Sequence, residues 1–165
     1  MNPWLGVMNT PSDAYAFGVA LGGVLVAADL VVLNGPLGAG KTTLTQGLAE
    51  GLGVRGPITS PTFVIARVHP SLVGGPKLVH VDAYRLGGSA ELDDLDLDTD
   101  LEQAVTVVEW GAGLAEALGD SRLEITLSPG QDERRKVTLR PIGSRWTGGR
   151  DVVALEPWRD VDEEG

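Results

Sequence analysis

The sequence contains no cysteine among its 165 residues. It therefore cannot form disulfides, thiolate metal sites or a cysteine nucleophile, and it suits a reducing cytoplasm. Only two histidines are present, which is too few for a histidine-rich metal cluster. The longest apolar stretch, around residues 24–33, is interrupted by Asp29, so no membrane-spanning helix is expected. The first residues also lack the basic region of a secretory signal, and we expect a cytoplasmic protein.

Basic residues are scarce as well. There are 13 lysines and arginines against 23 aspartates and glutamates, which gives a net charge of −10. An acidic surface repels the nucleic-acid backbone, so tight direct binding of RNA or DNA is not expected. The length suits a single domain over residues 1–165, with a flexible tail after about residue 156.

A glycine-rich stretch lies between an apolar strand candidate and a helical pattern. Residues 35–43 fit the phosphate-binding pattern of Gly, four residues, Gly, Lys and then Ser or Thr. Glycines let successive backbone N–H groups point into one concavity, and the following helix adds its positive end. Lys41 would reach the β- and γ-phosphates and the Thr42 hydroxyl would bind Mg²⁺. The residues predicted to contact the nucleotide are Gly35, Leu37, Gly38, Ala39, Gly40, Lys41, Thr42 and Thr43. The alternative is a glycine-rich turn without a ligand.

Periodicity and turn residues predict the remaining elements. A helix begins at the N-cap Thr10 and runs to about Ala28, and no clear period precedes it. The other expected elements are a buried strand at 29–34, a helix at 41–53, a hairpin of strands at 63–68 and 77–82, short helices at 91–97, 98–103 and 112–118, a strand at 104–108, a second hairpin at 123–127 and 136–139, and an edge strand at 152–155. They predict an α/β fold: a P-loop NTPase-like three-layer domain with a central, mostly parallel sheet and antiparallel hairpin additions.

Two carboxylates follow hydrophobic strands. Asp82 ends one strand and Glu109 ends another. Because ligands of α/β sheets gather at the carboxyl ends of the strands, both could face the γ-phosphate; the alternative is a strand cap or a turn. Thr62 lies in the loop after the first strand–helix unit, where its hydroxyl could reach Mg²⁺ or the attacking water, or could simply cap a turn. The two histidines, His69 and His80, are read as structural.

These motifs occur together with further short blocks. The blocks are Ser60-Pro61-Thr62-Phe63, Asp82-Ala83-Tyr84-Arg85-Leu86 and Val108-Glu109-Trp110. In this order and spacing the chain resembles the TsaE (YjeE) family of bacterial tRNA threonylcarbamoyladenosine biosynthesis ATPases. The resemblance covers roughly residues 10–139. Residues after Pro141 carry no family motif.

The resemblance implies a cytoplasmic ATPase that uses ATP and Mg²⁺ and turns over weakly alone. It would act with TsaD-like and TsaB-like proteins to place a threonylcarbamoyl group on N6 of adenosine 37, giving t6A, in tRNAs that read codons starting with A. It implies that Thr42 and Glu109 neighbour Mg²⁺, with Asp82 contributing directly or through water, and that Thr62 sits in a switch-like loop. Pro11 and Arg135 match its further nucleotide contacts.

Two other classes of protein can carry the same glycine-rich loop. A small-molecule P-loop kinase has the same motif and size, although no arginine-rich lid stands out between Leu86 and Val105. A nucleotide-switched assembly module with negligible catalysis would also bind ATP. A GTPase is disfavoured because no guanine-reading Asn-Lys-x-Asp sequence is present.

Overall fold

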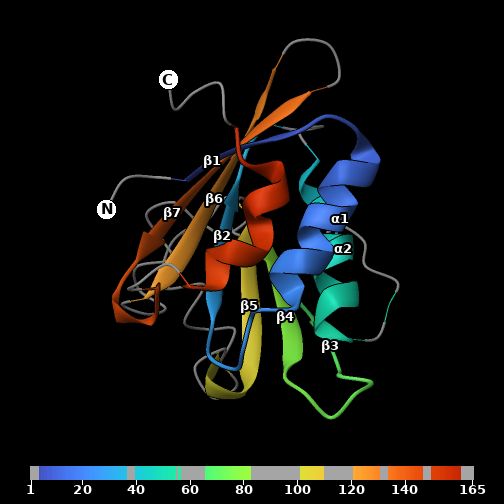
Figure 1. Ribbon diagram of the computed structural model, residues 1–165. Helices are drawn as coiled ribbons and strands as arrows, with labels where there is room; N and C mark the ends of the chain where they lie inside the picture. Colours follow the sequence, from blue (N-terminus) through green and yellow to red (C-terminus); the bar gives the residue numbers. More distant parts are fainter. Residues whose placement is uncertain are drawn as a thin grey trace.

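A seven-stranded sheet forms the centre of the computed structural model, which describes residues 4–36, 40–54, 56, 66–82, 101–109, 121–130, 134–146 and 150–160. Its strands are β1 (Trp4–Met8), β2 (Leu30–Asn34), β3 (Ala66–His69), β4 (Lys77–Asp82), β5 (Ala104–Glu109), β6 (Arg122–Pro129) and β7 (Arg135–Ile142). Their order across the sheet is β1-β7-β6-β2-β5-β4-β3 (Figure 1).

Parallel strands occupy the middle of this sheet and antiparallel strands its edges. β6, β2, β5 and β4 run parallel, whereas β7 and β1 on one side and β3 on the other pair in the antiparallel sense. Both predicted hairpins are present, as β3–β4 and β6–β7. The predicted α/β fold class, with antiparallel additions to a parallel centre, is therefore confirmed. The carboxyl ends of all four central strands lie at one edge.

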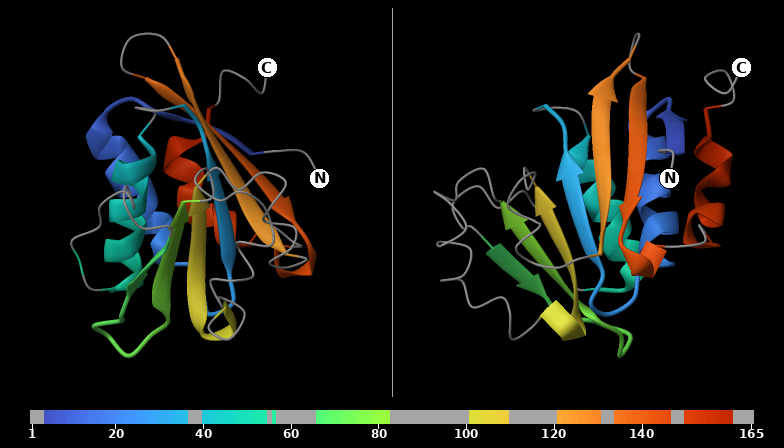
Figure 2. Two further views of the ribbon diagram at one scale, coloured as in Figure 1. Left: turned by 180° about the vertical axis from the view of Figure 1, so that it is seen from behind. Right: turned by 90° about the vertical axis from the view of Figure 1, so that its left-hand side faces the viewer.

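Two helices, α1 (Pro11–Gly22) and α2 (Lys41–Leu52), cover one face of the sheet (Figure 2). Their apolar side chains join one hydrophobic core with those of the strands. Leu30–Leu33 of β2 are all at most 5% exposed, as expected for a central parallel strand buried on both faces. Short 3₁₀ helices follow at Leu101–Gln103, Ser144–Trp146 (η5) and Arg150–Trp158 (η6).

The two α-helices touch backbone to backbone through four glycines. A Cβ atom at Gly18 would collide with the backbone of Leu44, and one at Gly47 would collide with that of Tyr15. Gly22 and Gly51 meet the opposite backbone in the same way. At the edge of this contact, the Tyr15 hydroxyl donates a hydrogen bond to the Glu50 carboxylate. This bond, partial burial and the negative charge of Glu50 raise the pKa of the Tyr15 phenol. The absence of side chains thus sets how closely α1 and α2 approach.

The first helix begins where the sequence predicts but ends earlier. The Thr10 hydroxyl accepts a hydrogen bond from the Asp13 N–H at 3.1 Å, and Pro11 is the first helical residue. The expected end near Ala28 is wrong, because the helix stops at Gly22 and Ala28 has a positive φ of 77°. Apolar residues continue the helical pattern past the end, but the backbone there forms turns.

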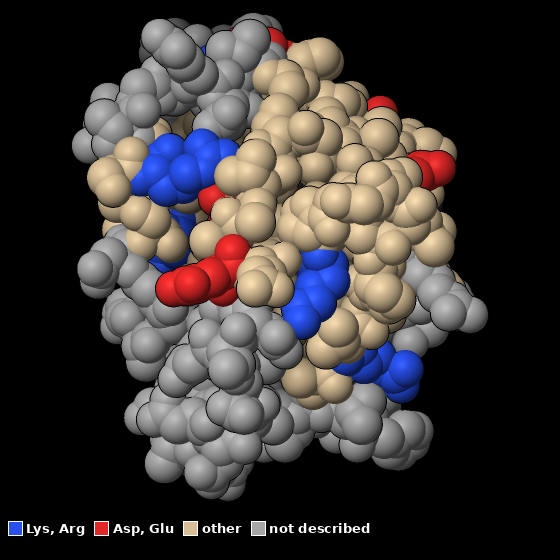
Figure 3. All heavy atoms as spheres, turned by 90° about the horizontal axis from the view of Figure 1, so that it is seen from below, with Lys and Arg blue, Asp and Glu red and all other residues tan. Residues whose placement is uncertain are grey.

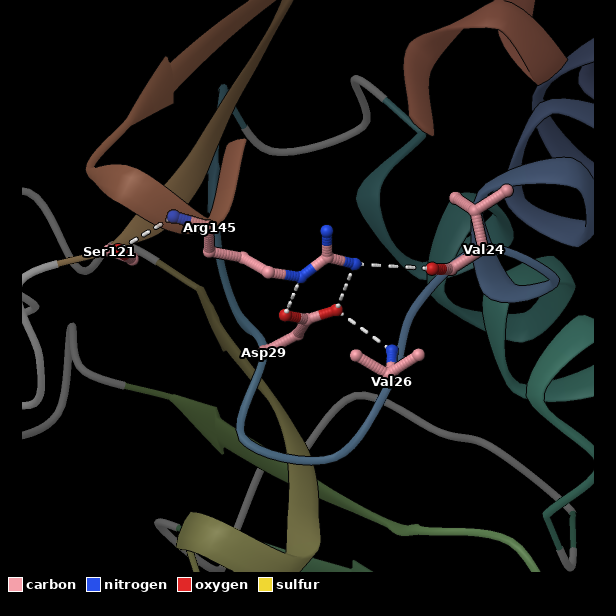
Figure 4. Close-up of polar contacts among 5 residues, drawn as sticks. All are labelled: Val24, Val26, Asp29, Ser121 and Arg145. Atoms are coloured by element: carbon pink, nitrogen blue, oxygen red, sulfur yellow. Dashed lines mark hydrogen bonds and ion pairs between the residues drawn. The ribbon is translucent and has the colours of Figure 1, made fainter. Parts of the chain in front are cut away.

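A partly buried ion pair fixes the turn between α1 and β2 (Figure 4). Asp29 is 4% exposed, and its carboxylate accepts hydrogen bonds from Arg145 Nε at 2.8 Å and Nη2 at 3.1 Å. The same carboxylate accepts from the Val26 N–H at 2.8 Å. The Arg145 guanidinium also lies 4.4 Å from the centre of the Trp146 ring. Because Arg145 is in η5, this contact ties the C-terminal part of the chain to the strand that leads into the glycine-rich loop.

Both ends of the described chain differ from expectation. The first residues form β1, which pairs with β7, although the sequence shows no period there. The expected edge strand at 152–155 is wrong, since these residues belong to η6. Trp158 of η6 meets Phe17 of α1 edge to face, with ring centres 5.6 Å apart. Beyond η6, Arg159 forms an isolated antiparallel β-bridge with Gly6 of β1, and the Asp160 N–H donates to the Leu5 carbonyl at 3.0 Å.

Several expected segments lie outside the described residues. They include the expected helices at 91–97 and 112–118 and most of the loop around Thr62. Within the parts of the chain that are described, no helix is long and apolar enough to cross a membrane.

Adding one methyl group at the helix contact tests its importance. We expect Gly47→Ala to lower the free energy of unfolding by about 1–3 kcal/mol, because the new Cβ forces α1 and α2 apart, although alanine favours helix more than glycine does. Gly23→Ala is the control, since a Cβ there meets its nearest atom at an ordinary 3.5 Å. Thermal and urea unfolding measure both variants. Equal stability of the two would contradict the close backbone contact.

Candidate nucleotide-binding site

The glycine-rich loop joins β2 to α2, as its sequence pattern requires. Gly35 and Gly40 both have positive φ angles, of 152° and 101°. Such angles are readily reached only by glycine, so both motif glycines are needed for the path of the backbone. Leu37, Gly38 and Ala39, at the centre of the loop, lie outside the described residues.

Helix α2 presents an uncapped N-terminus at the end of this loop. Gly40 is its N-cap, and among the described residues no side chain caps this helix start with a hydrogen bond. The first N–H groups of a helix have no partner within the helix, and together with the helix dipole they attract anions. Thr42 and Thr43, in the first turn, are both half-buried. This strand–loop–helix arrangement is the context that the glycine-rich motif requires.

Lys41 folds back over the loop from which it emerges. Its Nζ atom donates to the Gly35 carbonyl at 2.6 Å and to the Pro36 carbonyl at 3.1 Å. The side chain is only 6% exposed. The Lys41 carbonyl in turn accepts from the Thr45 hydroxyl at 2.8 Å. A positive charge is therefore held within the loop itself, beside the uncapped N-terminus of α2.

Strand register brings the two predicted carboxylates to the end of β2. Asp82 of β4 is the Cα partner of Glu109 of β5, and Glu109 is also the partner of Leu33 of β2. Neighbouring strands are about 4.8 Å apart, so the backbone of Asp82 lies about 10 Å from that of Leu33, with Glu109 between them. Glu109 is 4% exposed. Of Asp82, the structure describes the backbone and not the side chain.

Glu109 makes a hydrogen bond that the sequence does not reveal. Its Oε2 atom lies 2.7 Å from Nε2 of His80, which is fully buried. His80 stands two residues before Asp82 on β4, so the two residues share a strand face by alternation. The two-residue spacing of His80 and Asp82 in the sequence already indicates a shared strand face. The contact of His80 with Glu109, however, also depends on the register of β4 against β5. His80 is thus placed against a predicted site residue.

Pro11 and Arg135 also lie at the loop end of the molecule. Gly47 packs against Tyr15 and Gly51 against Val19, so α1 and α2 run in the same direction and begin at the same end. Pro11 is the first residue of α1. Arg135 is half-buried at the start of β7, where it is the strand partner of Met8, shortly before α1 begins.

The β6–β7 hairpin projects beyond the end of the sheet at which the glycine-rich loop leaves β2 (Figure 1). Asn34, the last residue of β2, is the partner of Thr126, and β6 continues to Pro129, the partner of Arg135. Three further residues extend a strand by about 10 Å. Arg135 therefore lies on the projecting part of the hairpin.

The predicted site residues that the structure describes converge on one edge of the sheet. The loop, the start of α2, Glu109, the backbone of Asp82, Pro11 and Arg135 all lie at the carboxyl ends of the parallel strands. Thr62 lies outside the described residues, and the functional roles of all these residues remain predictions.

Comparison with known proteins points to one family. The family model described as "Threonylcarbamoyl adenosine biosynthesis protein TsaE" matches residues 8–137. A protein of Streptomyces coelicolor named "tRNA threonylcarbamoyladenosine biosynthesis protein TsaE" is 60% identical over 143 residues, which cover 84% of this chain and 96% of that protein. A Bacillus subtilis protein of the same name is 40% identical over 119 residues, covering 72% of this chain and 73% of that protein.

A solved structure agrees with these sequence matches. The crystal structure of YdiB from Bacillus subtilis matches with a TM-score of 0.73 at 29% identity, covering 94% of this chain and 93% of that one. The matched family region contains the glycine-rich loop, β4, β5 and the start of the β6–β7 hairpin. The chain therefore belongs to the TsaE family of threonylcarbamoyl adenosine biosynthesis proteins.

Proposed function

We propose that this protein is the Mg²⁺-dependent, ATP-binding and ATP-hydrolysing component of a system that makes t6A in tRNA. The observation that carries the proposal is the meeting of a phosphate-type loop with Glu109 and Asp82 at one edge of the sheet. A loop alone binds phosphate, whereas hydrolysis also needs groups that hold the metal and orient water. Family membership supports the same assignment.

Phosphate binding would depend on the loop and the start of α2. Backbone N–H groups of the loop and of Thr42 and Thr43 would bind phosphate oxygens. Lys41 would neutralise charge on the β- and γ-phosphates, which spreads over the oxygens as the terminal phosphoryl group is transferred to water. Its ammonium group donates to two carbonyls of the loop, which keeps the positive charge within the segment proposed to bind phosphate. Pro11 and Arg135 would contact the nucleotide from the start of α1 and from the projecting hairpin.

The residues present suit a Mg²⁺ ion that is shared with the nucleotide. Mg²⁺ prefers oxygen ligands and usually binds one or two carboxylates plus substrate phosphates. Thr42 and Glu109 supply a hydroxyl and a carboxylate, with Asp82 contributing directly or through water. When bound, Mg²⁺ would neutralise charge on the phosphates; Thr62 would sense the γ-phosphate or orient the water.

The output of the ATPase would pass to proteins. We propose TsaD-like and TsaB-like partners that transfer the threonylcarbamoyl group to adenosine 37, with tRNA contacted only indirectly and the complex in the cytoplasm. The net charge of −10 opposes direct RNA binding. In the view from below, the Lys and Arg side chains of the described residues lie in separate groups with acidic and uncharged surface between them (Figure 3).

Removing the loop lysine tests nucleotide binding. We expect Lys41→Ala to weaken binding of ATP and ADP by about 100-fold or more, because charge-assisted contacts of about 1.5 kcal/mol each are lost. Lys77→Ala is the matched control, since Lys77 begins β4 at the opposite end from Asp82. Isothermal titration calorimetry with Mg²⁺ measures both. Equal affinities of the two variants would contradict the proposed loop function.

Removing the carboxylate at the end of β5 tests hydrolysis separately. We expect Glu109→Gln to lower the rate of ATP hydrolysis at least about tenfold while some nucleotide binding remains, because the group that holds the metal or orients water is lost. Glu102→Gln is the control, because Glu102 is exposed just before the amino end of the same strand. Asp82→Ala should behave like Glu109→Gln. Unchanged hydrolysis in both carboxylate variants would refute the mechanism.

Partner capture and tRNA nucleoside analysis separate this function from its alternatives. We expect the protein to retain TsaD-like and TsaB-like proteins from its own cells, and we expect Lys41→Ala in the cell to deplete t6A. Faster ATP turnover with these partners than without them would exclude a purely structural nucleotide switch. A small-molecule kinase would phosphorylate an acceptor instead, and t6A would be unaffected by the Lys41 variant.

A further inference from the structure

The histidine beneath Glu109 is an unexpected polar group in an apolar part of the sheet. His80 has no exposed surface, and its Nε2 atom lies 2.7 Å from Glu109 Oε2. Its strand partner is Val107, and along the same face of β4 it lies between Leu78 and Asp82. Val107 and Leu78 belong to the hydrophobic core. Glu109, itself 4% exposed, thus receives a contact from the imidazole of a fully buried residue.

The hydrogen bond fixes the arrangement of the imidazole. An ionised carboxylate can only accept, so with Glu109 charged the proton must be on Nε2 of His80. The other ring nitrogen, Nδ1, is buried and has no hydrogen-bond partner among the residues that the structure describes. Burying an unpaired polar atom disfavours folding, so an apolar side chain would serve this position better if packing were its only task. The contact with Glu109 is what distinguishes histidine here.

We propose that His80 is a positioning residue for Glu109. By donating to Oε2 it fixes the plane of the carboxylate and commits one oxygen, so that Oε1 is the atom offered to the metal or to the water that attacks the γ-phosphate. This inference rests on the proposed role of Glu109 in ATP hydrolysis. His80 itself touches no reacting atom. Groups that orient a ligand through such a second contact typically change affinity or activity 10- to 100-fold when removed.

Two substitutions separate positioning from packing. His80→Gln can place an amide N–H near the position of Nε2 and keep the donor to Glu109, whereas His80→Leu fills space without a donor. We expect His80→Leu to lower kcat about 10- to 100-fold with little change in KM for ATP, and His80→Gln to restore most of the rate. Because Glu109→Gln removes the group that is positioned, adding His80→Leu to it should cause no further loss. Additive losses in the double variant, or an equal loss in His80→Gln and His80→Leu, would overturn the proposal.

A measurement without nucleotide tests the same contact. In protein labelled with ¹⁵N in its imidazoles, we expect the His80 signals, identified by their loss in His80→Gln, to show a protonated Nε2 and to shift in Glu109→Gln. A proton on Nδ1 together with a bare Nε2 would overturn the proposal. Comparison of wild type, Glu109→Gln and His80→Leu distinguishes a failure of the His80 proposal from a failure of the proposed ATPase function. If wild type does not hydrolyse ATP, the proposed function fails; if Glu109→Gln is impaired but His80→Leu is not, only the role of His80 fails.

Discussion

The close approach of α1 and α2 is the constraint on which the site depends. Four glycines let the two backbones meet without side chains between them, at the cost of about 1 kcal/mol of helix propensity for each glycine. Since α2 begins at the glycine-rich loop and α1 begins at Pro11, this contact fixes the two helix starts relative to each other. A backbone contact has no rotamers, so the distance between the starts cannot relax as it could through long side chains.

The remaining site groups are set by the sheet. β2 lies between β5 and β6, with all three parallel, so the loop leaves the sheet beside Glu109 on one side and the projecting hairpin on the other. The Asp29–Arg145 pair anchors the turn that enters β2, far from the site but on the strand that feeds it. Groups far apart in the sequence thus meet because the parallel strands share one carboxyl edge.

Sequence reasoning succeeded where the signal is local. The buried run of β2, the N-cap of α1, the extent of α2 and the two hairpins follow from periodicity and turn residues, and the loop motif has its predicted context. Prediction from the sequence failed where contacts with residues far away in the chain determine the local structure. Apolar residues after Gly22 look helical, but the Asp29 carboxylate organises a turn there; β1 pairs with a strand about 130 residues later. The role assigned to His80 needed the register of β4 against β5, which no local pattern encodes.

The C-terminal residues also change what surface the sheet presents to other molecules. β1 is an outermost strand, and Arg159 and Asp160 lie along it through the bridge to Gly6 and the hydrogen bond to Leu5. Exposed strand edges are templates for pairing with other chains. Proteolytic removal of these residues would therefore expose the unpaired backbone groups of β1. We expect self-association through this strand edge before any loss of catalysis.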